Sequence, residues 1–354
     1  MKYFLISKLS FLYTPFLVFS CLSCSNNSNG NEESEEVSEI EGIVNVDPSL
    51  FLSEGLVEPI TTEEKTLSDG TVALCYKIVT NTTPSDHTMG PWCPTNIADG
   101  ADKGGKWFEN GELYDVDGAF IENLDEFYSD STWKMYDENG DIYTTDSQEA
   151  CEAAANPNVG EEYANYCVYC QHSYFDDITV TYYIPVTPVK LDAPDFIGGA
   201  LAGPPDGGGP PDGQAPPNGG APAGMESSVI GTAFNGVNFD PPAPTAQILG
   251  AYTIAPMDDN GGHVNPATGY HYHAATGTTT VVAQSDGHAG MIGYAMDGFG
   301  IHEQMNEDGA EPTDLDDCRG HTDDIRGYHY HVAAPGTNSF INCFNGAQGI
   351  YELN

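Results

Sequence analysis

The segment Gly269-Tyr270-His271-Tyr272-His273 returns later in the chain as Gly327-Tyr328-His329-Tyr330-His331. A Gly-His pair precedes each copy at the same distance, Gly262-His263 and Gly320-His321. The repeated unit is therefore Gly-His, five variable residues and Gly-Tyr-His-Tyr-His, with an offset of 58 positions between copies. A pattern of this length with fixed gaps indicates an internal repeat.

The alternation of Tyr and His predicts a short strand in each copy, because successive side chains of a strand point to opposite faces. His271 and His273 then share one face, with Tyr270 and Tyr272 on the other. Two imidazoles at this spacing stand about 6 to 7 Å apart at their Cα atoms, close enough to bind one metal ion together. The tyrosines are expected to pack in the core.

The histidines of both copies are the candidate metal ligands, because neutral imidazole is a common ligand of zinc and copper. The six residues are His263, His271, His273, His321, His329 and His331. They predict either one site per copy or a single site shared by both strands. Three ligands with an open fourth position are typical of a reactive site. The alternative is structural: buried histidines that are hydrogen-bonded to aspartates and backbone carbonyls.

Two further residues are candidates for the metal site. His288 is an additional candidate ligand. Asp297 lies in a glycine-rich, otherwise apolar segment, where an aspartate is costly to bury unless it is paired. We expect Asp297 to orient a ligand histidine or to bind the metal itself. The alternative is a turn residue before Gly298.

These segments resemble the YHYH-domain proteins, a family of bacterial envelopes and some other organisms. The resemblance rests on both Gly-Tyr-His-Tyr-His copies, on Gly320-His321 and on residues 292–299 between the copies. Segments 86–94 and 165–170 resemble stretches that accompany the domain in longer members. The family has no settled biochemical activity, so the resemblance implies an envelope protein without naming a reaction.

The chain is strongly acidic. Its 354 residues include 53 Asp and Glu but only 10 Lys and Arg, a formal net charge of -43. Such a surface repels nucleic acids and anionic membranes, which argues against both as direct partners. The acidity has two interpretations, solubility in a salty medium or attraction of divalent cations. The expected partner is a metal ion; the sequence identifies no small-molecule or glycan ligand.

Residues 1–23 predict an export signal with an apolar run from Phe11 to Phe19. Cys24 is followed by a polar stretch, as in bacterial lipoproteins, and is the expected lipidated residue; Cys21 is the other candidate. The sequence thus predicts an envelope protein, an outer-membrane or cell-surface lipoprotein that contacts the membrane only through this lipid. The alternative is a secreted protein with an ordinary cleaved signal.

Seven cysteines remain after the signal, and an oxidising compartment favours their pairing. Cys318 and Cys343 bracket the second copy and are expected to form a disulfide. The other five leave one cysteine over, and the sequence does not decide the pairing among Cys75, Cys93, Cys151, Cys167 and Cys170.

The predicted fold is mainly β, with two β-rich parts joined by a Gly/Pro-rich linker. An acidic, disordered tether (24–42) follows the signal. An N-terminal β-rich region with one short helix (43–197) precedes the linker (198–224). The C-terminal region (225–354) is expected to be all-β and to carry the repeat. The helix is expected to have Asp146 as its N-cap and to end at Asn156-Pro157.

The functional prediction is transition-metal binding, zinc or copper, through the repeated His-x-His strands. Whether the protein is an enzyme stays open: a metal-dependent hydrolase or oxidase is one hypothesis, and a metal carrier or sensor is another. A third hypothesis is a metal-free adhesion or carbohydrate-binding module, with structural histidines and an aromatic ligand face. Substrate, metal identity and oligomeric state do not follow from the sequence.

Overall fold

The computed structural model describes residues 42–156, 159–197 and 229–354. The predicted export signal, Cys24, nearly all of the tether and the Gly/Pro-rich linker lie outside the described residues. The described residues belong to one compact unit, Ile40–Asn354. Within these ranges, no helix is both long and apolar enough to cross a membrane.

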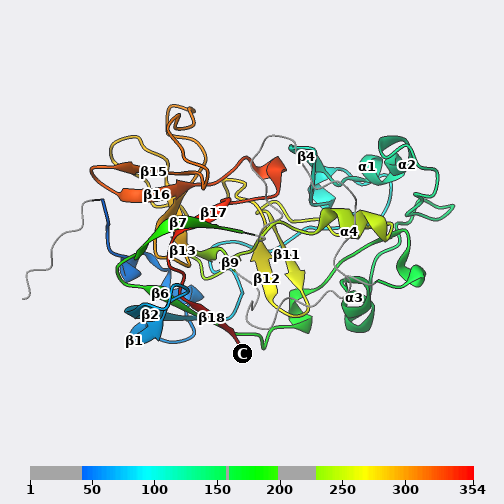
Figure 1. Cartoon of the computed structure of the whole chain (residues 1–354). Coiled ribbons are helices and arrows are strands. Elements are labelled where there is room, and N and C mark those ends of the chain that lie inside the picture. The colour runs from blue at the N-terminus through cyan, green and yellow to red at the C-terminus, as the bar shows by residue number, and fades with distance from the viewer. Residues whose placement is uncertain (1–41, 157–158, 198–228) are drawn as a thin grey trace, which may run out of the picture. The chain divides into compact units, whose positions relative to one another are not determined.

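An eight-stranded mixed sheet carries both copies of the repeated unit (Figure 1). Its strand order is β11-β12-β9-β8-β13-β14-β16-β15. The strands are β8 (Gly231–Ala233), β9 (Asn238–Phe239), β11 (Gly262–Asn265), β12 (Gly269–Tyr272), β13 (Met291–Ala295), β14 (Gly300–His302), β15 (Gly320–Asp323) and β16 (Gly327–His331). Each copy forms an antiparallel hairpin, β11–β12 or β15–β16, and the two hairpins lie at opposite edges of the sheet.

The two halves of this sheet repeat each other beyond the histidine units. β12 pairs in parallel with β9, so that His271 lies opposite Asn238. In the other half, β16 pairs in parallel with β14, so that His329 lies opposite Gly300. The repeat therefore includes a second hairpin in each half, β8–β9 and β13–β14.

The centre of the sheet confirms the internal repeat. β8 and β13 pair antiparallel with Thr232 opposite Tyr294, and these two residues occupy equivalent positions of the two halves. The halves are thus related by a local two-fold axis. Asn235-Gly236 forms the turn of the β8–β9 hairpin, and Asp297-Gly298 forms its counterpart between β13 and β14. Both glycines have positive φ (93° and 88°), the conformation that favours glycine at such turns.

The other strands form four smaller sheets. A four-stranded sheet has the order β1-β2-β6-β18, and the two-stranded sheets pair β10 with β5, β17 with β7 and β3 with β4. Their strands are β1 (Thr61–Thr66), β2 (Val72–Thr80), β3 (Lys106–Glu109), β4 (Glu112–Asp115), β5 (Tyr166–Cys167), β6 (Val180–Pro185), β7 (Lys190–Phe196), β10 (Thr253–Ile254), β17 (Cys343–Gly346) and β18 (Ile350–Leu353). Three sheets combine strands from both sides of segment 198–228. The mainly β prediction is confirmed, and strands before and after this segment share one framework.

Helices are short, and two expectations about them need correction. The described α-helices are α1 (Gly118–Glu122), α2 (Leu124–Phe127), α3 (Gln148–Ala154) and α4 (Thr245–Gly250). The predicted helix is α3, although its cap is Ser147, whose hydroxyl accepts a hydrogen bond from the amide of Ala150. The N-terminal region contains α1 and α2 as well, and α4 contradicts an all-β C-terminal region. Helices of four to six residues are too short to show a hydrophobic period, which explains why the sequence pattern missed them.

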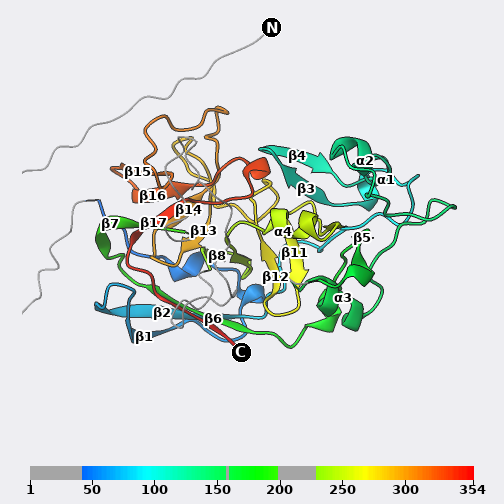
Figure 2. The same cartoon turned by 45° about the vertical axis from the view of Figure 1, so that its right-hand side comes forward.

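The helices α1, α2 and α4 pack against short strands outside the eight-stranded sheet. α1 and α2 lie beside the β3–β4 hairpin, where the rings of Phe120 and Phe127 contact Tyr114. α4 packs against β10, the strand that follows it. Figure 2 shows α1 and α2 beside β3 and β4. An isolated β-bridge joins Val282 to Met291.

Three disulfides connect the described cysteines: Cys93–Cys167, Cys151–Cys170 and Cys318–Cys343. The last is the pairing expected from the sequence. Cys75 carries the free thiol and is buried. The structure thus supplies the two pairings that the sequence left open.

We expect the double substitution Cys318→Ser and Cys343→Ser to lower the free energy of unfolding by about 3 kcal/mol, because the bond closes a loop of 25 residues. Urea denaturation of the oxidised protein measures this loss. Cys75→Ala is the control, since it alters a buried cysteine without removing a cross-link. A double variant as stable as the parent protein would contradict the assignment.

Candidate metal centres

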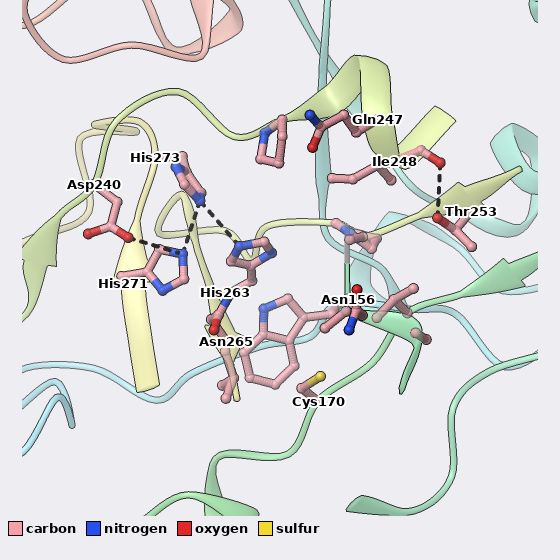
Figure 3. Close-up of a pocket in the computed structure, with 18 of the residues that line it drawn as sticks. Asn156, Cys170, Asp240, Gln247, Ile248, Thr253, His263, Asn265, His271 and His273 are labelled. Carbon is pink, nitrogen blue, oxygen red and sulfur yellow. Dashed lines mark hydrogen bonds and ion pairs between the residues drawn. The ribbon is translucent and has the colours of Figure 1, made fainter. Parts of the chain in front are cut away.

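The first histidine cluster lies at the β11–β12 edge of the eight-stranded sheet. His263 of β11 lies opposite His271 of β12, and His273 follows β12 on the same side. Nε2 of His273 is 3.0 Å from Nε2 of His271 and 3.2 Å from Nε2 of His263. Figure 3 shows the three rings turned toward one another. The hairpin register and the two-residue spacing together produce this convergence.

The second cluster lies at the opposite edge and has one more member. His321, His329 and His331 repeat the first arrangement, and His288 joins them from the segment before β13. Nε2 of His331 is 3.1 Å from Nε2 of His321, and Nε2 of His329 is 3.0 Å from Nε2 of His288. The ring of His302 on β14 packs against this group, with its centroid 4.8 Å from that of His329.

The Nε2 spacing matches a tetrahedral metal site. Four nitrogen ligands at about 2.0 to 2.1 Å from zinc stand roughly 3.3 Å from one another. The measured separations of 3.0 to 3.2 Å lie just below this value. The ligand atoms of each cluster all lie within 4.8 Å of one another, so each cluster could hold a metal ion.

In these rings Nδ1, the nitrogen directed away from the cluster, faces an oxygen atom. Backbone carbonyls accept from Nδ1 of His271 (Gly269, 3.1 Å), His273 (Pro241, 2.7 Å), His329 (Gly327, 2.9 Å), His331 (Glu303, 2.9 Å) and His288 (Ala289, 2.9 Å). The carboxylate of Asp314 accepts from His321 at 2.9 Å, and the backbone of Ala255 bonds to His263. A carbonyl oxygen only accepts hydrogen bonds, so each Nδ1 that faces one carries the proton of the neutral ring.

This tautomer is incompatible with hydrogen bonds between the Nε2 atoms of neighbouring imidazoles, while the bonds from Nδ1 to backbone carbonyls are those that the structural alternative expects. A neutral imidazole has a single N–H, and here it is used on Nδ1. Nε2 of His271 and Nε2 of His273 then present only lone pairs to each other at 3.0 Å. Facing lone pairs at this distance repel unless a cation lies between them. The same holds for His329 and His288 in the second cluster.

Burial favours the neutral form of four of the cluster histidines, His263, His273, His329 and His331. It lowers the pKa of His329 to about 4 and that of His331 to about 3, and neighbouring imidazoles act in the same direction. The pKa values of His263 and His273 also lie well below the usual range, chiefly because both rings are buried. Neutral imidazole is the form that binds metals.

The two clusters are separate sites. In the strand order, β12 and β16 are five strands apart, and a strand spacing of about 4.8 Å puts them roughly 24 Å apart along the sheet. No single ion can contact both groups. The structure thus excludes the shared site that the sequence left open.

Asp297 does not join the histidines. It lies at the β13–β14 turn and accepts hydrogen bonds from the Tyr330 hydroxyl at 2.6 Å and the Gly346 amide at 3.0 Å. Burial raises its pKa to about 6. The expectation that Asp297 pairs with a ligand histidine is wrong, because its carboxylate lies on the tyrosine face of β16.

The tyrosines of the repeats lie in the interior, as the strand alternation predicts. Tyr270, Tyr272 and Tyr330 have no exposed surface, and Tyr328 is also buried. Their faces thus cannot form the exposed aromatic surface that an adhesion or carbohydrate-binding module would use. Tyr270 donates to Asp258 at 2.8 Å.

The sequence interpretation missed two residues beside the clusters, Asp240 and His302. They occupy equivalent positions, one after β9 and the other at the end of β14, as the matched strand registers show. The Asp240 carboxylate is 3.7 Å from Nε2 of His271. A comparison of the two Asn/Asp-Gly turns would have revealed this equivalence, because each residue follows its turn glycine by four positions.

The metal-free protein should lose stability as pH falls from about 6.5 toward 4. Unfolded histidines take up protons near pH 6.5, whereas the buried His329 and His331 resist protonation down to about pH 4 and 3. The unfolded state therefore binds more protons in this window, and the free energy of unfolding decreases with falling pH. Thermal unfolding of the apoprotein at several pH values measures the effect.

The variant His329→Gln/His331→Gln removes two of the titrating groups and should weaken this pH dependence. Parallel curves for the variant and the parent protein would show that these histidines do not contribute to it.

Comparison with known families yields one match. Residues 214–314 match a family model described as YHYH protein, a span that contains the first histidine unit and the β13–β14 hairpin. No curated protein and no solved structure matches the chain.

Proposed function

The chain carries a YHYH-family domain, and from this premise we propose that the protein binds two transition-metal ions, zinc or copper, one in each histidine cluster. The facing Nε2 atoms carry this proposal. In each cluster two pairs of Nε2 atoms lie 3.0 to 3.2 Å apart, all ligand atoms lie within 4.8 Å of one another, and hydrogen bonds from Nδ1 to backbone or carboxylate oxygens leave the Nε2 lone pairs free.

Several features of the chain support a cation in these positions. The ligand rings are held by backbone carbonyls, which fixes their orientation before an ion arrives. The net charge of -43 attracts divalent cations at long range. Nitrogen-only donor sets of this kind suit zinc and copper better than magnesium or calcium, which prefer oxygen ligands.

We expect the purified full-length protein to bind two zinc or copper ions per chain near neutral pH. His271→Ala and His329→Ala should each remove one ion, because the sites are independent, and the double variant should bind none. Metal analysis after dialysis gives the stoichiometry.

Tyr272→Phe and Tyr330→Phe are the matched controls, since they change the opposite face of the same strands and should retain both ions. The proposal fails if folded protein binds neither metal. A single histidine substitution that empties both sites would disprove their independence.

We also propose that the protein works outside the cytoplasm, attached to the envelope through a lipid on Cys24. Three disulfides support an oxidising compartment. The lipid anchor rests on the sequence around Cys24 alone.

In a bacterial host, the protein should fractionate with membranes, and Cys24→Ala should release it or block its processing. Immunoblotting of membrane and soluble fractions measures this distribution. Cys21→Ala is the control; if it has the effect instead, Cys21 is the lipidated residue. A protein that stays soluble in every case is not lipid-anchored.

A further inference from the structure

A cavity of about 430 Å³ adjoins the first histidine cluster. His263, His271 and His273 contribute to its lining, and Figure 3 shows them at one end of the cavity. Much of the remaining wall is apolar and comes from separate parts of the chain, among them Trp92, Ala155 after α3, Val168 and Ile248 of α4. A metal ion held by the three imidazoles would therefore face a partly enclosed, mainly apolar space.

The two clusters differ in the number of imidazoles available. In the second cluster, His288 provides a fourth ring whose Nε2 is 3.0 Å from that of His329. The first cluster has three. Three histidines of the described residues belong to neither cluster: His87 contacts the hydroxyls of Tyr270 and Tyr272, His172 contacts Thr83, and His302 lies beside the second cluster.

The residue beside each cluster also differs between the two halves of the sheet. His302 lies beside the second cluster. In the first half this position is Asp240, which accepts a hydrogen bond from the amide of Asn238 with one carboxylate oxygen. Its other oxygen is 3.7 Å from Nε2 of His271, the ligand histidine that it contacts. A carboxylate thus replaces an imidazole beside the cluster that adjoins the cavity.

We propose that the first site is a ligand-binding metal centre, and that its remaining coordination position takes a small molecule from the cavity. This inference rests on the metal binding proposed above. The ligand has a neutral nitrogen, oxygen or sulfur donor at one end, which coordinates the ion, and an apolar body. The second site, with four imidazoles, holds its ion without an external ligand.

The shape and chemistry of the cavity define this ligand class. A volume of about 430 Å³ suits a small organic molecule, and a mainly apolar lining with a few polar groups is typical of such sites. The Trp92 indole donates its N–H to the carbonyl of Gly262 at 3.0 Å, so it offers no donor to the ligand. The net charge of -43 disfavours an anionic ligand.

Cobalt(II) absorption spectroscopy of the full-length protein tests this inference, with imidazole and 4-phenylimidazole as probes. Both share the donor nitrogen, and only the second has an apolar body. We expect saturating probe to change the spectrum of one of the two cobalt ions. 4-Phenylimidazole should bind at least tenfold more tightly than imidazole, because its phenyl ring is buried in the cavity.

Three variants locate the binding site. His273→Ala should abolish the spectral change, whereas His331→Ala, which alters the second site, should retain it. Ala155→Trp fills the cavity away from the ion. It should weaken 4-phenylimidazole binding at least tenfold while leaving the metal content and imidazole binding unchanged.

The outcomes separate this inference from metal binding itself. Two bound cobalt ions whose spectra respond to neither probe would overturn the open position and leave the proposed function intact. Equal affinity for both probes, or a response that follows His331 instead of His273, would overturn the role of the cavity. Folded protein that binds no metal would refute both proposals.

Discussion

The hydrogen bond from Nδ1 of a buried histidine to a backbone carbonyl is the interaction on which both candidate sites depend. It fixes the neutral tautomer and turns the lone pair of Nε2 toward the neighbouring rings. In His271 and His329 the acceptor is the carbonyl two residues earlier in the same strand, Gly269 or Gly327. The repeated motif thus contains both the ligand and the group that orients it. Burial lowers the pKa of His329 and His331, which favours the neutral form that binds a metal ion.

The internal two-fold arrangement explains why the sites are alike and why they are separate. The repeat meets its copy at the central β8–β13 pair, so the histidine hairpins occur at the two outer edges of the sheet. Residues around one histidine cluster can therefore be substituted without altering the other cluster. The neighbours of the clusters have diverged accordingly: His288 and His302 accompany the second cluster, whereas Asp240 and a cavity accompany the first.

The segments outside the repeat give the first site its surroundings. The Cys151–Cys170 disulfide connects α3 to the segment after β5, and β10 pairs with β5. These contacts bring Ala155 and Val168 to the wall of the cavity that His263 also lines. The second half of the repeat is accompanied by a different disulfide, Cys318–Cys343, next to β15 and β17. A duplicated unit has therefore been placed in two different environments by the chain around it.

The sequence by itself determined the mainly β class, the repeat, the separation of His and Tyr onto opposite strand faces and the Cys318–Cys343 pairing. These features depend on local alternation and spacing, which a strand imposes directly on its residues. Only the tertiary structure showed that the histidines form two separate clusters and that Asp297 pairs with Tyr330. It also showed that Asp240 and His302 lie beside these clusters. The helices α1, α2 and α4 and the cavity likewise emerged only from the structure. Each of these depends on strand order or on contacts between distant segments, and no local pattern records which strands become neighbours.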